Sequence, residues 1–225
     1  MVIKGLVDED FIQYKKPSMF IIFPYCDFKC DKEAGCTICQ NSALANEPNI
    51  NISIMELVTR YISNPITKAI VFGGLEPFDS LNDLLCLIFN LRLHTNDDII
   101  IYTGYTEKEL EQKNIFNKLK DIQNIIIKFG RFVPNQEKHY DKVLGVELAS
   151  PNQYAKQIGG QRELKISKNP DPVAFAAIQA KVKENDGYCP CALIKDDTTR
   201  CPCLEFRQRH TEGECHCGLY IKEYK

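Results

Sequence analysis

The sequence predicts an α/β protein in which parallel strands are joined by right-handed helical crossovers, as an α/β layer or a partial barrel. Short apolar runs rich in Ile, Val and Phe are typical of buried strands. Amphipathic helical patterns separate several of these runs, which is the alternation that parallel sheets require. The expected strands are residues 19–23, 69–72, 99–102, 125–129 and 143–148.

Three helices are expected between these strands, each opened by residues that cap helix N-termini. Cys86 lies on the apolar pattern of the second helix and is expected to be a small buried side chain. The capping residues are Ser53 with Glu56, Asp79 with Ser80, and Thr106 with Glu109.

The pattern breaks around residues 158–161, and a boundary is expected near residue 160, giving domains 1–160 and 161–225. Residues 169–172 (Asn-Pro-Asp-Pro) predict the start of a short helix over 173–182, which ends at 185–187 (Asn-Asp-Gly). The segment after the boundary is too short to bury a large core, so a metal site would stabilise it.

Composition excludes several classes of protein. The chain has 225 residues, 44% of them hydrophobic, which is typical of a globular protein. The 28 Lys and Arg nearly balance the 30 Asp and Glu, so we expect no nucleic-acid or membrane partner. Residues 128–132 mix basic and aromatic side chains, and we interpret them as a solvated strand end or a rim contact. No apolar run spans a membrane and no signal pattern opens the chain, which predicts a cytoplasmic protein.

Cysteine is the unusual residue of this composition, with 11 in the chain. Ten of the eleven lie in two tight clusters, and clustered cysteines without an export signal are more often metal ligands or redox thiols than disulfides. The first cluster is Cys26, Cys30, Cys36 and Cys39, and the second is Cys189, Cys191, Cys201, Cys203, Cys215 and Cys217.

The first cluster follows the first expected strand. Four thiolates could close a tetrahedral zinc site, and three could hold a 4Fe–4S cluster with one iron open to a substrate. The spacing alone does not choose between these metals. After the second strand, Gly73 and Gly74 let a ligand approach the backbone, and Glu76 places a carboxylate at the carboxyl edge of the sheet, where α/β proteins bind ligands.

Residues 1 to about 158 resemble the radical S-adenosylmethionine enzymes, and more narrowly the small activating proteins of anaerobic ribonucleotide reductases. The resemblance implies a partial (βα) barrel with a 4Fe–4S cluster on three cysteines. It also implies S-adenosylmethionine on the open iron, its amino end held by residues 73–76, and a radical passed to a glycine of a partner enzyme. The matching segments are 39–41 (Cys-Gln-Asn), 73–77 (Gly-Gly-Leu-Glu-Pro), 102–106 (Tyr-Thr-Gly-Tyr-Thr) and 149–153 (Ala-Ser-Pro-Asn-Gln).

The cysteine loop is longer than the usual Cys-x3-Cys-x2-Cys of this family. We assign the metal ligands as Cys26, Cys30 and Cys39, with Cys36 spare, although Cys36 in place of Cys30 also fits the last gap. Thr103 joins Gly73, Gly74 and Glu76 as an expected cofactor-binding residue.

The second cluster pairs its cysteines as two Cys-Pro-Cys and one Cys-His-Cys. Adjacent thiols of an extended Cys-x-Cys point to opposite faces, and six thiols exceed the four that a cluster needs. Two are therefore left for redox chemistry, and counting does not say which two.

Residues 187–220 resemble the catalytic subunit of ferredoxin:thioredoxin reductase. The resemblance implies a second 4Fe–4S cluster, a redox disulfide of Cys191 and Cys217, proton transfer by His216, and a small, mostly helical domain. The implied cluster ligands are Cys189, Cys201, Cys203 and Cys215. A zinc module is the alternative for this tract.

Together the two resemblances predict a radical S-adenosylmethionine activase fused to a disulfide reductase domain. Its expected partners are a glycyl radical enzyme such as an anaerobic ribonucleotide reductase, a thioredoxin-like protein, and a ferredoxin or flavodoxin as electron donor. One alternative is a radical reaction on another substrate, with the C-terminal domain as electron donor. The other is a non-catalytic zinc adaptor.

Overall fold

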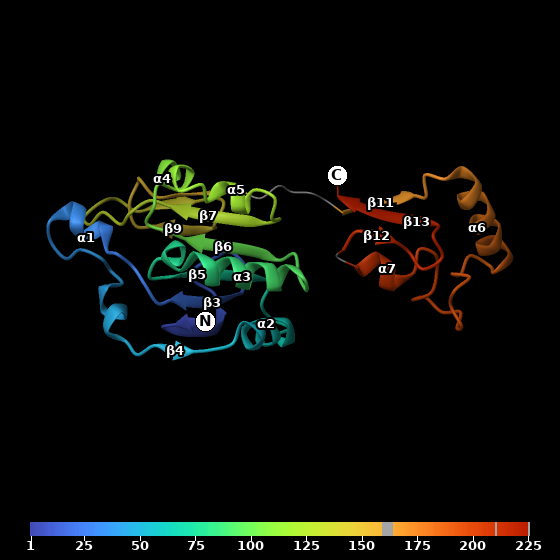
Figure 1. The fold of residues 1–225 in the computed structure, drawn as a ribbon, viewed down its shortest axis with the longest axis horizontal. Helices are drawn as coiled ribbons and strands as arrows, with labels where there is room; N and C mark the ends of the chain where they lie inside the picture. The colour runs from blue at the N-terminus through green and yellow to red at the C-terminus, as the bar shows by residue number, and fades with distance from the viewer. Residues whose placement is uncertain (159–163, 210, 225) are drawn as a thin grey trace. The chain divides into compact units, whose positions relative to one another are not determined.

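The computed structural model describes residues 1–158, 164–209 and 211–224. The chain divides into two compact units, Met1–Gln161 and Arg162–Lys225 (Figure 1). The boundary expected near residue 160 falls on residues 159–163, which lie outside the described part of the chain.

The N-terminal unit is built on a six-stranded mixed sheet in the order β10-β7-β6-β5-β3-β2. The four inner strands are parallel and adjacent in chain order, which confirms the α/β prediction. The outer strands β2 and β10 are antiparallel to their neighbours, and the sequence analysis missed both. The bounds are β2 Gly5–Asp10, β3 Ser18–Phe23, β5 Ala69–Gly74, β6 Asp98–Tyr102, β7 Ile125–Phe129 and β10 Tyr154–Gln157.

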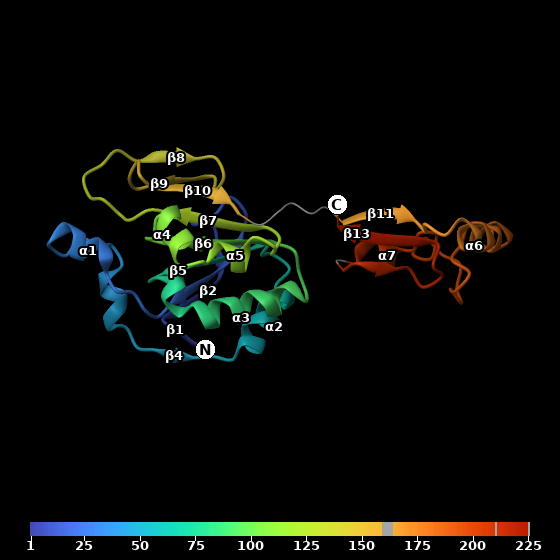
Figure 2. The same ribbon diagram turned by 45° about the horizontal axis from the view of Figure 1, so that its top comes forward.

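Both faces of the sheet are covered, which is why its inner strands are apolar throughout. One face packs against the helices in the larger core, and the other contacts Tyr14, Leu144 and Leu148. Figure 2 shows α2 and α3 on one side of the sheet and the β8–β9 ribbon on the other. The helices are α2 Ile54–Ser63, α3 Leu81–Arg92, α4 Glu107–Gln112 and α5 Phe116–Leu119.

Two of the three expected helix caps are present as hydrogen bonds. Ser53 accepts from the Glu56 amide, and Thr106 and Glu109 form a reciprocal capping box. Ser80 precedes α3 but makes no side-chain cap. Instead, Glu76 caps the preceding 3-10 helix η2 (Pro77–Ser80).

The expectation that Cys86 is buried is wrong. Cys86 is exposed on α3, because the buried face of that helix is set by residues three and four apart. These residues are Leu84, Leu87, Ile88 and Leu91.

The strand expected over 143–148 is shorter and belongs to a separate ribbon. Only β9 (Val146–Leu148) is extended, and it pairs with β8 (His139–Asp141) outside the main sheet. Asp141 holds the connecting turn by accepting from the Val143 and Leu144 amides at 2.9 Å each. A local turn therefore replaces the first half of the expected strand.

Four short elements complete the N-terminal unit. Strand β1 (Val2–Ile3) pairs with β4 (Ile50–Asn51). Helix α1 (Lys29–Ala34) lies inside the first cysteine cluster, and the 3-10 helix η1 (Ser42–Asn46) follows the cluster.

The C-terminal unit combines two helices with a three-stranded antiparallel sheet, so the expectation of a mostly helical domain is wrong. The sheet order is β11-β13-β12, and β11 pairs with β13 across most of the unit's sequence. Because the two strands are so far apart in sequence, no local sequence pattern predicts their pairing. The bounds are β11 Leu164–Lys168, α6 Pro172–Glu184, α7 Leu204–Gln208, β12 Gly213–Glu214 and β13 Tyr220–Tyr224.

Helix α6 begins and ends as its flanking residues predict. Asp171 accepts from the Val173 and Ala174 amides, and the helix ends before Asp186, whose φ is positive. The buried core of this unit is small and consists of Phe206, Cys215 and Leu219. Such a core gives limited stability without a further cross-link.

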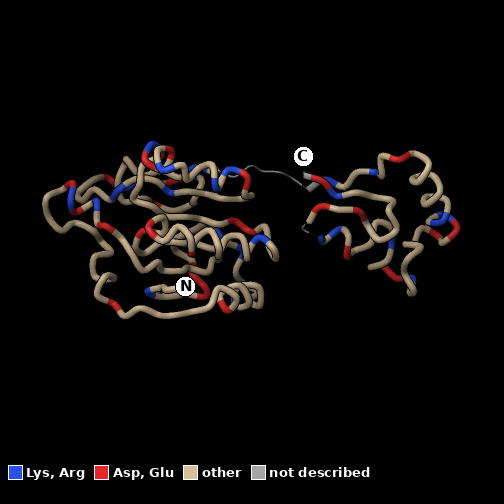
Figure 3. The backbone as a smooth tube through the Cα atoms, viewed as in Figure 1, with Lys and Arg blue, Asp and Glu red and all other residues tan. Residues whose placement is uncertain are grey.

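Within the described residues, no helix is long and apolar enough to cross a membrane. Figure 3 shows acidic and basic residues interspersed along both units. This mixture agrees with the net charge of −2.

Candidate metal centres

A cavity of about 540 Å³ lies where the parallel strands of the main sheet reach their carboxyl ends. Phe20 and Ile22 of β3, Tyr102 of β6 and Lys128 of β7 line it from the sheet face that carries no helices. This is the edge at which parallel α/β sheets bind ligands. The cavity also contains six of the residues expected at the site from the sequence, namely Cys26, Cys30, Cys39, Gly74, Glu76 and Thr103.

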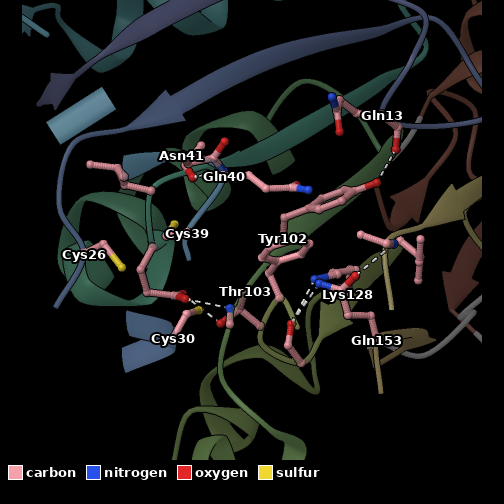
Figure 4. A pocket seen from close by; sticks show the side chains of 18 of the residues that line it. Gln13, Cys26, Cys30, Cys39, Gln40, Asn41, Tyr102, Thr103, Lys128 and Gln153 are labelled. Carbon is pink, nitrogen blue, oxygen red and sulfur yellow. Dashed lines mark hydrogen bonds between the residues drawn. The ribbon is translucent and has the colours of Figure 1, made fainter. Parts of the chain in front are cut away.

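Three of the four thiols in the first cluster share this cavity. Figure 4 shows Cys26, Cys30 and Cys39 on one side of it, with Tyr102 and Lys128 farther across. Cys36 is exposed and does not line the cavity. The fold thus separates the thiols into three that face a common space and one that faces solvent.

The cysteine loop is anchored to the turn that follows β5. The Glu76 amide donates to the Tyr25 carbonyl at 2.8 Å, just before the first cysteine. At the other end, Asn41 Nδ2 donates to the Gly74 carbonyl at 2.7 Å. The loop is therefore held at both ends by the same short segment.

The two glycines of this segment have different roles. Gly74 has φ +81°, and a Cβ there would lie 2.4 Å from Ile22 Cγ2, so no other residue fits without a shift. Gly73 is inside β5 and does not line the cavity; a Cβ there would meet the Phe20 ring at 3.1 Å. Gly73 therefore affects the cavity indirectly, by leaving room for the Phe20 ring that lines it.

Glu76 is buried and ties two expected site segments together. Its carboxylate accepts from Thr103 Oγ1 at 2.8 Å, the Gly104 amide at 2.9 Å and the Phe78 amide at 3.2 Å. Burial raises the pKa of Glu76 to about 7, against these hydrogen bonds, which lower it. Thr103 thus lines the cavity while also orienting Glu76.

Lys128 lines the cavity, which agrees with the second of the two interpretations of residues 128–132, a rim contact. Its side chain is in the cavity wall with 7% exposure, so a solvated strand end is wrong for it. Its ammonium donates to the Gly130 carbonyl at 3.0 Å, and burial lowers the pKa of Lys128 to about 8. Alternation along β7 was the available signal, because Ile126 and Lys128 share a face.

Arg131 follows β7 and fastens the cysteine loop to the helical side of the site. Its guanidinium donates to both oxygens of Glu109, at 2.6 and 3.0 Å, and lies 3.1 Å from a carboxylate oxygen of Glu33 in α1. The hydrogen bonds from Arg131 hold the pKa of Glu109 at about 2. A bidentate pair of this kind is geometrically specific.

We expect Glu109→Gln to destabilise the unit by about 1–2 kcal/mol at neutral pH, after allowance for the partial exposure of Glu109. The folded pKa is below the unfolded value, so this stability is present above about pH 4.5 and is lost as pH falls towards 2. Urea unfolding at several pH values measures it. An equal loss at pH 7 and at pH 2.5 would contradict the assignment.

Burial favours the protonated form of two of the cavity thiols, Cys26 and Cys30. Burial raises the pKa of Cys26 to about 12 and also raises the pKa of Cys30. Thiolates are the ligand form, so metal binding here must release protons.

The six thiols of the second cluster converge in the C-terminal unit. An isolated bridge between Tyr188 and Arg200 brings the first two Cys-Pro-Cys segments together. Cys203 immediately precedes α7, and the turn between β12 and β13 carries Cys215 and Cys217. The Sγ atoms of these last two are 3.6 Å apart.

Exposure differs among these thiols. Cys189 and Cys215 are buried, whereas Cys191 is exposed. Burial, together with the charges of neighbouring thiols, raises the pKa of Cys217 to about 12 and that of Cys201 to about 11. Two buried thiols therefore lie at the centre of the set, and one lies at its surface.

His216 lies between two of these cysteines on the surface. Its side chain is 63% exposed, and Nδ1 is 3.8 Å from a carboxylate oxygen of Glu205. The imidazole is therefore accessible to a partner that approaches the thiols.

The thiol distances can be compared with those of a single metal site. A tetrahedral zinc site places its thiolates about 3.8 Å apart, from a Zn–S distance of about 2.3 Å. The Sγ atoms of Cys215 and Cys217 are 3.6 Å apart, whereas among the described residues the three potential ligands that lie within 4.8 Å of one another are Cys26, Asp27 and Asp79. Thiolates are soft ligands that suit iron–sulfur clusters as well as zinc.

Thiol sets of this kind are typical of iron–sulfur proteins. Comparison with protein families identifies the class more closely: the 4Fe-4S single cluster domain matches residues 18–152. This match covers more than half of the chain, and the chain belongs to that family. The ferredoxin thioredoxin reductase catalytic beta chain matches residues 138–225. No curated protein and no solved structure gives a match.

Proposed function

We propose that this chain is an oxidoreductase with two 4Fe–4S clusters. Its N-terminal unit, residues 1–160, is a radical S-adenosylmethionine activase that installs a glycyl radical on an anaerobic ribonucleotide reductase or a related enzyme. Its C-terminal unit, residues 161–225, reduces a disulfide of a thioredoxin-like protein or of that partner.

One observation carries the first half of the proposal. Cys26, Cys30 and Cys39 face the same cavity as the turn from Gly74 to Glu76, at the carboxyl edge of four parallel strands. Three thiolates leave one iron of a cluster without a protein ligand, and the cavity has room for a nucleotide-sized molecule beside it. The sheet would then be the partial barrel that the sequence resemblance implies.

The side chains of the cavity have separate tasks in this proposal. Cys26, Cys30 and Cys39 would hold the cluster, which would supply one electron to the sulfonium of S-adenosylmethionine. Gly74 permits close approach of the ligand to the protein backbone, and Glu76 with Thr103 fixes the adjacent loop. Gly73 supports this segment from within β5.

The cavity is open to a macromolecular partner. Ile12 lines it and is 75% exposed, which supports an approach of the glycine-bearing segment past this residue in the proposed reaction. A radical formed inside the cavity must be passed on at short range, which requires such an opening.

The match to the ferredoxin thioredoxin reductase catalytic beta chain supports the second half of the proposal. The exposed Cys191 thiolate attacks a target disulfide and forms a mixed disulfide, and Cys217 then displaces the reduced target. His216 supplies the proton to the leaving thiolate. A ferredoxin or flavodoxin returns the two electrons singly. The cluster ligands are Cys189, Cys201, Cys203 and Cys215.

Anaerobic reconstitution of the full chain tests the proposal. We expect about eight iron and eight sulfide per chain, 5′-deoxyadenosine formation with a reductant and S-adenosylmethionine, and a glycyl radical signal on the partner enzyme. Two zinc ions without sulfide would overturn it in favour of a zinc adaptor. A methylated or rearranged small molecule, without a protein radical, would overturn the activase assignment.

A further inference from the structure

The first cysteine cluster holds one thiol more than its cavity uses. The extra thiol is Cys36, which is three residues before Cys39 in the same loop. The structure separates them, because Cys39 lines the cavity and Cys36 is exposed. Because this loop has little buried surface, some specific contact must fix the position of Cys39.

Asp31 makes this contact. A single carboxylate oxygen, Oδ1, accepts from the amides of both Ile38 and Cys39, each at 2.8 Å. Hydrogen bonds from backbone amides to a carboxylate are about twice as strong as neutral ones. Asp31 therefore fixes the main chain of Cys39 directly.

The backbone between these residues explains why Cys36 is excluded. Helix α1 carries Asp31 and ends at Gly35, which has φ +69° and reverses the chain. The chain returns to the Asp31 carboxylate at Ile38. Cys36 lies at the outside of this reversal, and Cys39 lies at its return.

The hydrogen bonds that Asp31 accepts lie close in sequence to the second anchor of the loop, Asn41. Asn41 Nδ2, two residues after Cys39, donates to the Gly74 carbonyl at the cavity. Asp31 on one side and Asn41 on the other thus leave the Cys39 thiol little freedom to move. No such contact to the cavity is present for Cys36 in the described chain, and its side chain faces solvent.

We infer that Asp31 is a positioning residue that selects Cys39 over Cys36 as the third ligand of the N-terminal cluster. This inference rests on the proposed cluster in this loop. It assigns a role to the extra residues between Cys30 and Cys39, which fold into a helical turn and a reversal that deliver the third thiol.

Chelator challenge and thiol labelling of the reconstituted full chain test the inference. In the unchanged protein, alkylation followed by mass spectrometry should label Cys36 and spare Cys39. Asp31→Ala should raise labelling of Cys39 at least about tenfold, and N-terminal iron should be lost to a chelator about 10- to 100-fold faster. Asp31→Asn keeps one acceptor oxygen and should fall between the two.

Two controls keep the inference separate from the proposed function. Cys36→Ser should retain iron as the unchanged protein does, and labelling of the C-terminal thiols gives an internal standard for the alkylation reaction in every variant. If the unchanged chain holds no cluster on Cys26, Cys30 and Cys39, the proposed function fails. If it holds one and Asp31→Ala keeps Cys39 protected and its iron equally inert, this inference alone is overturned.

Discussion

Cys191→Ser is expected to lower disulfide reduction by at least about a thousandfold and to leave the iron content unchanged. Cys191 is the exposed thiol of its set, and a target disulfide reaches an exposed thiol first. A serine hydroxyl is a much weaker nucleophile at neutral pH. Reduction of a thioredoxin-like substrate with a one-electron donor measures the rate, and a colorimetric iron assay measures the cluster.

Two matched variants complete this experiment. Cys201→Ser removes a proposed ligand and should lose iron and activity together, whereas Cys86→Ser removes an exposed thiol far along the chain and should change neither. Loss of iron from Cys191→Ser would show that Cys191 is a ligand. It would then reverse the division of the six thiols into ligands and redox pair.

Gly74→Ala is expected to destabilise the N-terminal unit by about 2–4 kcal/mol and to lower 5′-deoxyadenosine formation more than about a hundredfold. A left-handed backbone costs an alanine about 1–2 kcal/mol. The added Cβ would also lie 2.4 Å from Ile22 Cγ2 and 3.3 Å from Ile22 Cα, so the turn must move. The Gly74 carbonyl that anchors Asn41 moves with it, and the cysteine loop loses this tether.

A glycine of the cysteine loop separates the two causes. Gly35 has φ +69° with open space around it, so Gly35→Ala carries the backbone cost alone. Urea unfolding of both variants should show the larger loss in Gly74→Ala. Equal losses, with full 5′-deoxyadenosine formation in Gly74→Ala, would show that the contact with Ile22 does not shape the cavity.

The inner strands and the capped helices could be predicted because their signals are local. Residues 125–129 form β7 as expected, since an unbroken apolar run of that length is a buried strand. The edge strand β2 escaped prediction because its sequence, Gly-Leu-Val-Asp-Glu-Asp, is acidic at one end. Its pairing with β3 is decided by the partner strand and not by its own propensity.

The C-terminal unit shows the same limit. Strands β11 and β13 pair across more than fifty residues, and neither has the apolar run that marks an inner strand. Helix α6, in contrast, is bounded by residues that act on their immediate neighbours, so its place could be predicted. The prediction that Cys86 is buried was wrong for a related reason, because the face that a helix buries depends on what packs against it.

The sequence by itself indicated the kind of ligand that this protein offers to a metal. Residue type and spacing are enough to indicate thiolate ligands, because a cluster needs soft donors close together in the chain. Only the tertiary structure decided which thiols face a common cavity, that Lys128 lies in its wall, and that Asp31 holds Cys39. These facts depend on the crossing of segments distant in sequence, and no local pattern encodes the direction in which a side chain then points.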